Sequence, residues 1–133
     1  MHIQRQRLVG DVAVSRSFGC DPRWVRAARD WASEEYCRVG GRAADACQLL
    51  VSEVVTNAVR HTSSATFTVR VYSSHWIEVQ DSSSQLPQAR SAGPESESGR
   101  GLSLLDVLAP GHRVKFTETG KCIQFRPRSM EGY

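Results

Sequence analysis

The chain has 133 residues, of which 40% are hydrophobic and 23% are charged, a balance typical of one globular domain and unlike that of a disordered chain. The net charge of +3 comes from basic and acidic side chains scattered along the sequence, which makes a nucleic-acid partner a weak hypothesis. No apolar core follows the basic amino terminus and no apolar run approaches the length of a membrane span, so we expect a cytoplasmic protein with no membrane partner.

The cysteine pattern gives no sign of a zinc site. The four cysteines contain no C-x-x-C pair and have no histidine at ligand spacing: Cys20, Cys37, Cys47 and Cys122. Without such spacing, we expect four reduced thiols.

The first half of the chain predicts a strand and two helices. Residues 11–18 alternate well enough for a strand. Residues 21–41 begin with Asp21 and Pro22, which favour the first turn of a helix, and end with two glycines that favour its termination. A second helix is expected over residues 43–61.

The second half predicts two hairpins separated by a loop and a short helix. Strands are expected at 66–72 and 75–81, with a turn at Ser73 and Ser74. Residues 82–98 are rich in serine, contain two prolines and have little that is apolar, so they predict a long loop. Residues 99–109 predict a short helix, and residues 112–118 and 121–127 predict a closing hairpin.

This order of elements predicts an α+β fold. We expect a two-layer α/β sandwich with a mixed, mostly antiparallel sheet and helices on one of its faces. The whole chain, 1–133, forms a single domain in this interpretation, with loose tails at 1–7 and 127–133.

The second predicted helix carries a polar row that its apolar surroundings do not explain. Glu53, Asn57 and His61 follow one another at intervals of four residues, so they share one face of the helix. Glutamate is an acceptor and a potential base, and the asparagine carbonyl suits a hard cation such as magnesium. A polar stripe bonded to neighbouring loops is an equally good interpretation, and His61 is better explained as a residue that favours the helix end.

Two further signals come from the strand ending at Asp81 and from the glycines before the last helix. Asp81 shares a face with Ile77 and Val79, where a carboxylate needs a partner such as a ligand amine; a turn-capping aspartate is the common alternative. Gly99 and Gly101 flank Arg100 immediately before a helix, an arrangement that suits phosphate oxygens but is also a common turn.

Taken in order, these features resemble the GHKL nucleotide-binding superfamily, whose members share the Bergerat ATP-binding fold. The resemblance runs from about Val12 to Phe125, and "LLVSEVVTNAVRH" is similar to the N box of the anti-sigma factor serine kinase branch.

The resemblance implies a role for each matching residue. Glu53 corresponds to the general base, Asn57 to the magnesium ligand and Asp81 to the acceptor of the adenine amine. The second glycine box beside the phosphates corresponds to Gly99, Arg100, Gly101 and Leu102, with residues 82–98 as the ATP lid. Ser83 replaces the usual glycine two residues after the acid, and Cys122 is the nearest candidate for the threonine that often assists adenine binding.

The function implied by this resemblance is that of an ATP- and magnesium-dependent serine protein kinase. Such a protein sequesters a sigma factor and phosphorylates an anti-anti-sigma antagonist of the STAS type, and its relatives are often homodimers. Ser83 and Cys122 favour an alternative, a partner-binding module with weak or lost nucleotide binding. A histidine kinase catalytic domain is a third hypothesis, disfavoured because no phospho-acceptor segment is seen upstream.

Overall fold

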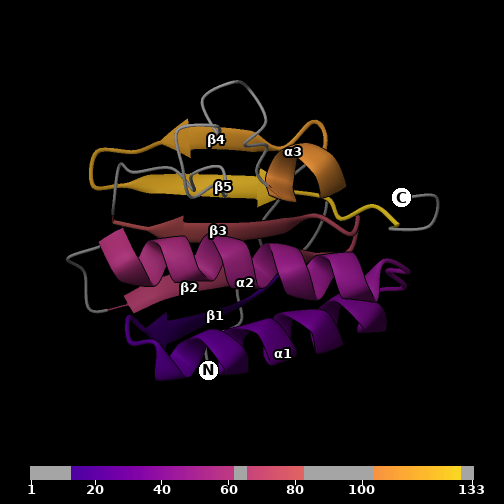
Figure 1. The fold of residues 1–133 in the computed structure, drawn as a ribbon, viewed down its shortest axis with the longest axis horizontal. Helices are drawn as coiled ribbons and strands as arrows, with labels where there is room; N and C mark the ends of the chain where they lie inside the picture. Colours follow the sequence, from indigo (N-terminus) through magenta and orange to yellow (C-terminus); the bar gives the residue numbers. More distant parts are fainter. Residues whose placement is uncertain (1–12, 62–65, 83–103, 130–133) are drawn as a thin grey trace, which may run out of the picture.

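Figure 1 shows one antiparallel sheet with helices packed over one of its faces. The computed structural model describes residues 13–61, 66–82 and 104–129. In chain order its elements are β1 (Ala13–Gly19), α1 (Arg23–Arg38), α2 (Ala44–His61), β2 (Thr66–Tyr72), β3 (Ile77–Asp81), α3 (Leu104–Leu108), β4 (Arg113–Phe116) and β5 (Lys121–Phe125). The predicted α+β fold with two layers is confirmed.

The sheet has the order β1-β2-β3-β5-β4, so β5 lies between β3 and β4. Every pairing among the described strands is antiparallel. In the β3–β5 register Asp81 is opposite Lys121 and Gln80 is opposite Cys122. Because successive side chains on a strand point to opposite faces, these two pairs lie on opposite faces of the sheet.

Helix α1 begins where Asp21 and Pro22 predicted it. Pro22 already has helical dihedral angles, φ −52° and ψ −30°. The Asp21 carboxylate accepts a hydrogen bond from the Arg23 backbone N–H at 3.0 Å, which satisfies one of the donors left unpaired at a helix start. The expected cap is therefore present, although the regular helix begins one residue later than Pro22.

The connection between β2 and β3 is longer than the predicted two-residue turn. Strand β3 begins at Ile77, and His75 adopts a φ of +77°. The His75 ring is held by a contact between Nε2 and the Val39 carbonyl oxygen at 3.0 Å. This tertiary contact accompanies a backbone conformation that the sequence pattern alone did not indicate.

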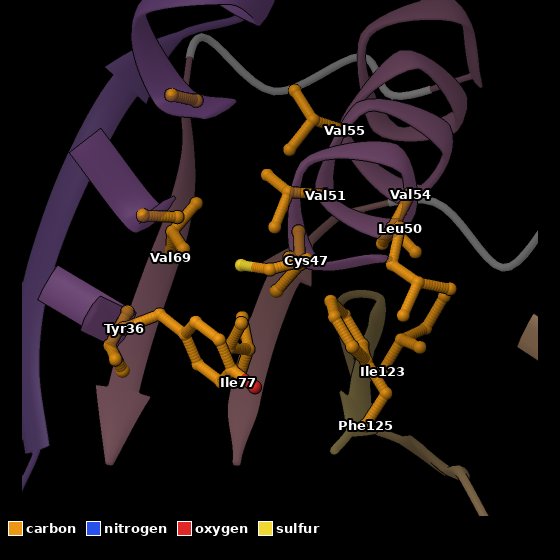
Figure 2. Close-up of a cluster of buried hydrophobic side chains, with 14 of the residues drawn as sticks. Tyr36, Cys47, Leu50, Val51, Val54, Val55, Val69, Ile77, Ile123 and Phe125 are labelled. Atoms are coloured by element: carbon orange, nitrogen blue, oxygen red, sulfur yellow. The ribbon is translucent and has the colours of Figure 1, made fainter. Parts of the chain in front are cut away.

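Helix α2 fills the centre of the core because it packs against α1, α3 and the sheet. Figure 2 shows Val51 and Val55 on one side of the helix, and Leu50 and Val54 on the side of Ile123. All four α2 side chains are fully buried, and burying a side chain of this size stabilises the fold by about 1.5–3 kcal/mol. The helix is thus fixed in rotation, and so is its polar row.

The end of the described chain is attached to α3. The Arg128 backbone N–H donates a hydrogen bond to the Leu108 carbonyl oxygen at 2.9 Å, and Pro127 is buried. Residues 127–129, expected to begin a loose tail, therefore contact the body of the domain.

Candidate functional site

The three residues of the polar row on α2 differ in burial, and only the middle one, Asn57, is buried in the core. Glu53 is half-buried, Asn57 is buried and His61, the last residue of the helix, is exposed. Asn57 is seven residues after Leu50, so it continues the helix face that Leu50 and Val54 turn toward β5 (Figure 2). Because Leu50 and Val54 pack into the core, Asn57 on the same helix face is buried at the edge of the core.

Asn57 is buried with its side-chain oxygen unsatisfied. The residue is only 6% exposed, and Oδ1 has no hydrogen-bond partner within the described part of the chain. Leaving such an acceptor buried and unpaired costs about 1–3 kcal/mol, and native proteins rarely do so. An amide oxygen in this condition fits a ligand for a hard cation.

A magnesium ion at Asn57 would need oxygens from outside the protein. The described residues contain no group of three or more histidine, cysteine, aspartate or glutamate side chains placed to hold a metal. Magnesium in nucleotide sites is commonly held by one or two side chains together with phosphate oxygens and water. The residues present therefore fit magnesium delivered with a nucleotide, with Asn57 as the protein ligand.

Asp81 lies at the end of β3 in a tight, buried setting. Its side chain is 1% exposed, and its two carboxylate oxygens each accept a hydrogen bond from Lys121 Nζ at 3.1 Å. Gly120 lies against the same strand end, because a Cβ atom added there would be 1.9 Å from the Asp81 carbonyl oxygen. The close approach of Gly120 brings Lys121 directly opposite Asp81.

The sequence did not single out Lys121. Its side chain is 0% exposed, and lysine is almost never buried to this extent unless it is paired. The signal that could have found it is the alternation of β5, in which Lys121 shares a face with Ile123 and Phe125, both part of the core.

Cys122 does not lie where the sequence interpretation needed it. Its partner across the sheet is Gln80, and its neighbour on β4 is Lys115. Burial raises its pKa to about 11, with a further contribution from the Glu78 carboxylate on the helix-free face. Cys122 therefore points away from the Asp81 carboxylate and cannot take the part of a threonine beside it.

The described site residues gather at one end of the sheet. Helix α2 ends at His61, and β2 begins shortly afterwards at Thr66. Because β2 and β3 are antiparallel, the start of β2 and the Asp81 end of β3 lie at the same edge, together with the start of β5 (Figure 1). Asn57 in the helical layer and Asp81 in the sheet therefore lie at the same end of the molecule.

A cysteine also lies in this region. Burial and, to a smaller extent, the Asp81 carboxylate raise the pKa of the Cys20 thiol. All four cysteines are free. Cys20 is therefore a neutral thiol that adds no charge near the Asp81 carboxylate.

The remaining predicted site residues lie outside the described part of the chain. They are Ser83, Gly99, Arg100, Gly101 and Leu102, together with nearly all of the 82–98 lid. The segment that contains them connects the Asp81 end of β3 to α3.

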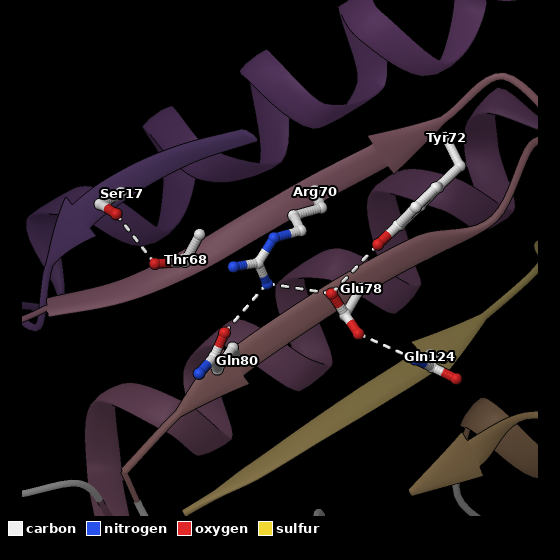
Figure 3. Close-up of polar contacts among 7 residues, drawn as sticks. All are labelled: Ser17, Thr68, Arg70, Tyr72, Glu78, Gln80 and Gln124. Atoms are coloured by element: carbon white, nitrogen blue, oxygen red, sulfur yellow. Dashed lines mark hydrogen bonds and ion pairs between the residues drawn. The ribbon is translucent and has the colours of Figure 1, made fainter. Parts of the chain in front are cut away.

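The helix-free face of the sheet carries a separate polar network, drawn in Figure 3. Glu78 Oε1 accepts hydrogen bonds from Arg70 Nη1 at 2.9 Å and from the Tyr72 hydroxyl at 3.4 Å, and Oε2 accepts one from Gln124 Nε2 at 2.8 Å. Arg70 also donates to Gln80 at 3.0 Å. These partners use both Glu78 oxygens, whereas the buried Nε of Arg70 has no hydrogen-bond partner within the described part of the chain. The network lies on the face of the sheet opposite the Asp81 carboxylate.

Comparison with known families agrees with the fold. The model of a family described as the histidine kinase-like ATPase domain matches residues 18–126. No curated protein matches the chain. In the part of the chain that the structure describes, no helix is long and apolar enough to cross a membrane.

Proposed function

The chain belongs to the histidine kinase-like ATPase domain family, and from this we propose that it binds ATP with magnesium, sequesters a sigma factor and phosphorylates an anti-anti-sigma antagonist on serine. The observation that carries the nucleotide part is the buried Oδ1 of Asn57, which has no hydrogen-bond partner among the residues that the structure describes. It lies on the same helix row as Glu53 and at the same end of the sheet as Asp81.

In this proposal the three described residues do different work. Asn57 binds the magnesium ion, which neutralises phosphate charge when the nucleotide is present. Asp81 accepts a hydrogen bond from the adenine amine. Glu53, one helical turn before Asn57 and only half-buried, takes the proton of the acceptor serine hydroxyl.

The partner assignment is supported by the sequence of α2. The stretch from Leu49 to His61 resembles the N box of the anti-sigma serine kinase branch, and a sigma factor and a STAS-type antagonist are the partners this resemblance implies. A homodimer and a cytoplasmic location belong to the same proposal.

One observation favours a second candidate, a partner-binding module with weak nucleotide binding. Lys121 already occupies both oxygens of Asp81, so an adenine amine meets an acceptor that is in use. In this candidate the fold is kept for sigma or antagonist binding, and phosphate transfer is weak or lost.

Thermal unfolding with magnesium and ATP tests the nucleotide site directly. A ligand that binds only the folded state at 100 times its dissociation constant stabilises it by about 2.7 kcal/mol, which raises the melting temperature. We expect this stabilisation to require magnesium and to be lost in Asn57→Ala, and to persist in the matched control Thr56→Ala, the preceding residue of the same helix. Absence of any ATP effect on folded wild-type protein would reject the nucleotide proposal.

Phosphate transfer and partner binding then separate the two candidates. Labelled ATP is incubated with the protein and with purified STAS-type antagonists from the same genome, while sigma factors are tested by pull-down. Transfer to a serine supports the kinase. Sigma or antagonist binding without transfer to any antagonist supports the binding module.

A further inference from the structure

The pairing of Asp81 with Lys121 determines what a nucleotide meets at this end of the sheet. Lys121 Nζ is 3.1 Å from both Oδ1 and Oδ2 of Asp81, and the two side chains are 0% and 1% exposed. The register places the residues directly opposite each other. Their alternation with Ile77, Val79 and Ile123 turns both side chains toward the helices.

This contact competes with the bond that adenine recognition needs. A carboxylate is an acceptor only, and an exocyclic amine reaches it as a donor. Lys121 is also a donor only, and it contacts both carboxylate oxygens, so an amine of the ligand must share an oxygen with the ammonium or displace it. The ammonium carries a full charge, which makes its hydrogen bonds to Asp81 stronger than those of a neutral amine.

The backbone around Asp81 is closely packed, so only the Lys121 side chain can move to make room for a ligand amine. Gly120 is packed against the end of β3 so closely that an added Cβ would be 1.9 Å from the Asp81 carbonyl oxygen and 2.5 Å from Ser82 Cα. The β3–β5 ladder comprises five residue pairs, from Asp81–Lys121 at this end to Ile77–Phe125 at the other. Room for an amine at Asp81 therefore comes from rotation of the Lys121 side chain and not from separation of the strands.

We infer that Lys121 sets the nucleotide affinity of this site by occupying the Asp81 acceptor until an adenine nucleotide displaces one of its contacts. The inference rests on the proposed ATP site and adds the residue that limits it. When only a fraction of the molecules has the conformation that can bind, the apparent dissociation constant is the intrinsic one divided by that fraction. Minor conformations are commonly about 0.1–10% populated, so removing the competitor tightens binding by at least about ten-fold.

The chain offers a clean test because it contains two lysines, Lys115 and Lys121. Lys121→Thr removes the charge and the reach of the side chain and introduces a hydroxyl beside Asp81. Lys115→Thr makes the same change on the neighbouring strand at an exposed position. Dissociation constants of MgATP are measured by calorimetry for wild type and both variants, with circular dichroism as the check of folding.

We expect Lys121→Thr to bind MgATP at least about ten-fold more tightly than wild type, and Lys115→Thr to match wild type. Equal or weaker binding by folded Lys121→Thr, with binding by wild type, overturns the inference and leaves the ATP proposal standing. If neither wild type nor folded Lys121→Thr binds MgATP, the proposed nucleotide site fails, and this inference fails with it.

A second measurement does not depend on the folding of Lys121→Thr. In Lys115→Thr protein labelled with nitrogen-15 lysine, Lys121 is the single labelled side chain. We expect its Nζ resonance to shift when MgATP is added, because one contact with Asp81 is exchanged. An unchanged resonance at saturating MgATP would show that the nucleotide leaves the pair intact and would overturn the inference.

Discussion

Cys122 lies directly opposite Gln80 across β3 and β5, on the face of the sheet that carries no helix. Asp81, the next residue after Gln80, lies on the other face, opposite Lys121. A shift of a single residue along β5 thus decides which side chain lies opposite the Asp81 carboxylate.

The first prediction follows from this register. Cys122→Ser should leave the MgATP dissociation constant unchanged within about two-fold, since the side chain faces away from Asp81. Asp81→Asn serves as the positive control, because its amide can present a donor to a donor, and a buried mismatch of this kind costs about 1–3 kcal/mol of binding. Both constants are measured by calorimetry. Loss of ATP binding in a folded Cys122→Ser protein would contradict the assignment of faces.

The same register explains what the sequence could predict of this site. The polar row of Glu53 and Asn57 was visible because helical spacing is fixed at about 3.6 residues per turn, so a residue's face follows from its number. Lys121 was missed because its role depends on pairing between strands 40 residues apart, and a strand's register is set by tertiary packing. Propensity and turn chemistry likewise predicted α1, but the connection before β3 also depends on a tertiary contact between His75 and Val39, the residue that follows α1.

The second prediction concerns stability at the Asp81–Lys121 pair. Asp81→Asn removes the charge opposite a buried ammonium, and breaking a buried pair in this way typically destabilises a fold by about 3–5 kcal/mol. Adding Lys121→Met to Asp81→Asn removes the buried ammonium that has lost its opposite charge. The double variant should therefore lose less stability than Asp81→Asn alone. Urea unfolding measures all three proteins.

The matched control for this cycle is Glu118→Gln, which neutralises an exposed acid in the loop between β4 and β5 and should change stability by less than about 0.5 kcal/mol. If Asp81→Asn proved no more destabilising than Glu118→Gln, the pair would contribute nothing to the fold.

The third prediction is a dependence of stability on alkaline pH. Burial, assisted by the neighbouring Glu78 carboxylate, raises the pKa of Tyr72 to about 12 from 10.0. Because the folded protein holds the phenol proton more tightly than the unfolded chain, the stability that this group contributes is complete below pH 10 and is lost as pH rises toward 12. Tyr72→Phe cannot titrate, so its unfolding free energy should fall less between these pH values than that of wild type.

Glu78→Gln provides the matching test of cause. It keeps the shape of the side chain that accepts from the Tyr72 hydroxyl but removes the negative charge, so the pKa of Tyr72 should fall while remaining above its ordinary value. Titration of tyrosinate absorbance in wild type and Glu78→Gln, each compared with its own Tyr72→Phe form, measures the difference. A pKa of Tyr72 that rises in Glu78→Gln would contradict the electrostatic contribution.

The last prediction separates the kinase from the binding module and concerns Glu53 and Asn57, one helical turn apart on α2. Asn57→Ala should lower both magnesium-dependent ATP binding and phosphate transfer, because Asn57 is the proposed metal ligand. Glu53→Gln keeps the size of the side chain and should keep most ATP binding. It should lower transfer to the antagonist by about 10²–10⁴-fold, the usual range for general-base catalysis.

Sigma-factor binding provides the control within the same experiment. A swap of nearly identical shape at one half-buried position removes a single charge and leaves the rest of the exposed surface as it is, so pull-down of the sigma factor should be equal for wild type and Glu53→Gln. Transfer by wild type that Glu53→Gln leaves unchanged would exclude Glu53 as the base and keep the kinase. No transfer by wild type, together with intact sigma binding and a melting temperature that still responds to MgATP through Asn57, would identify a nucleotide-responsive binding module on this fold.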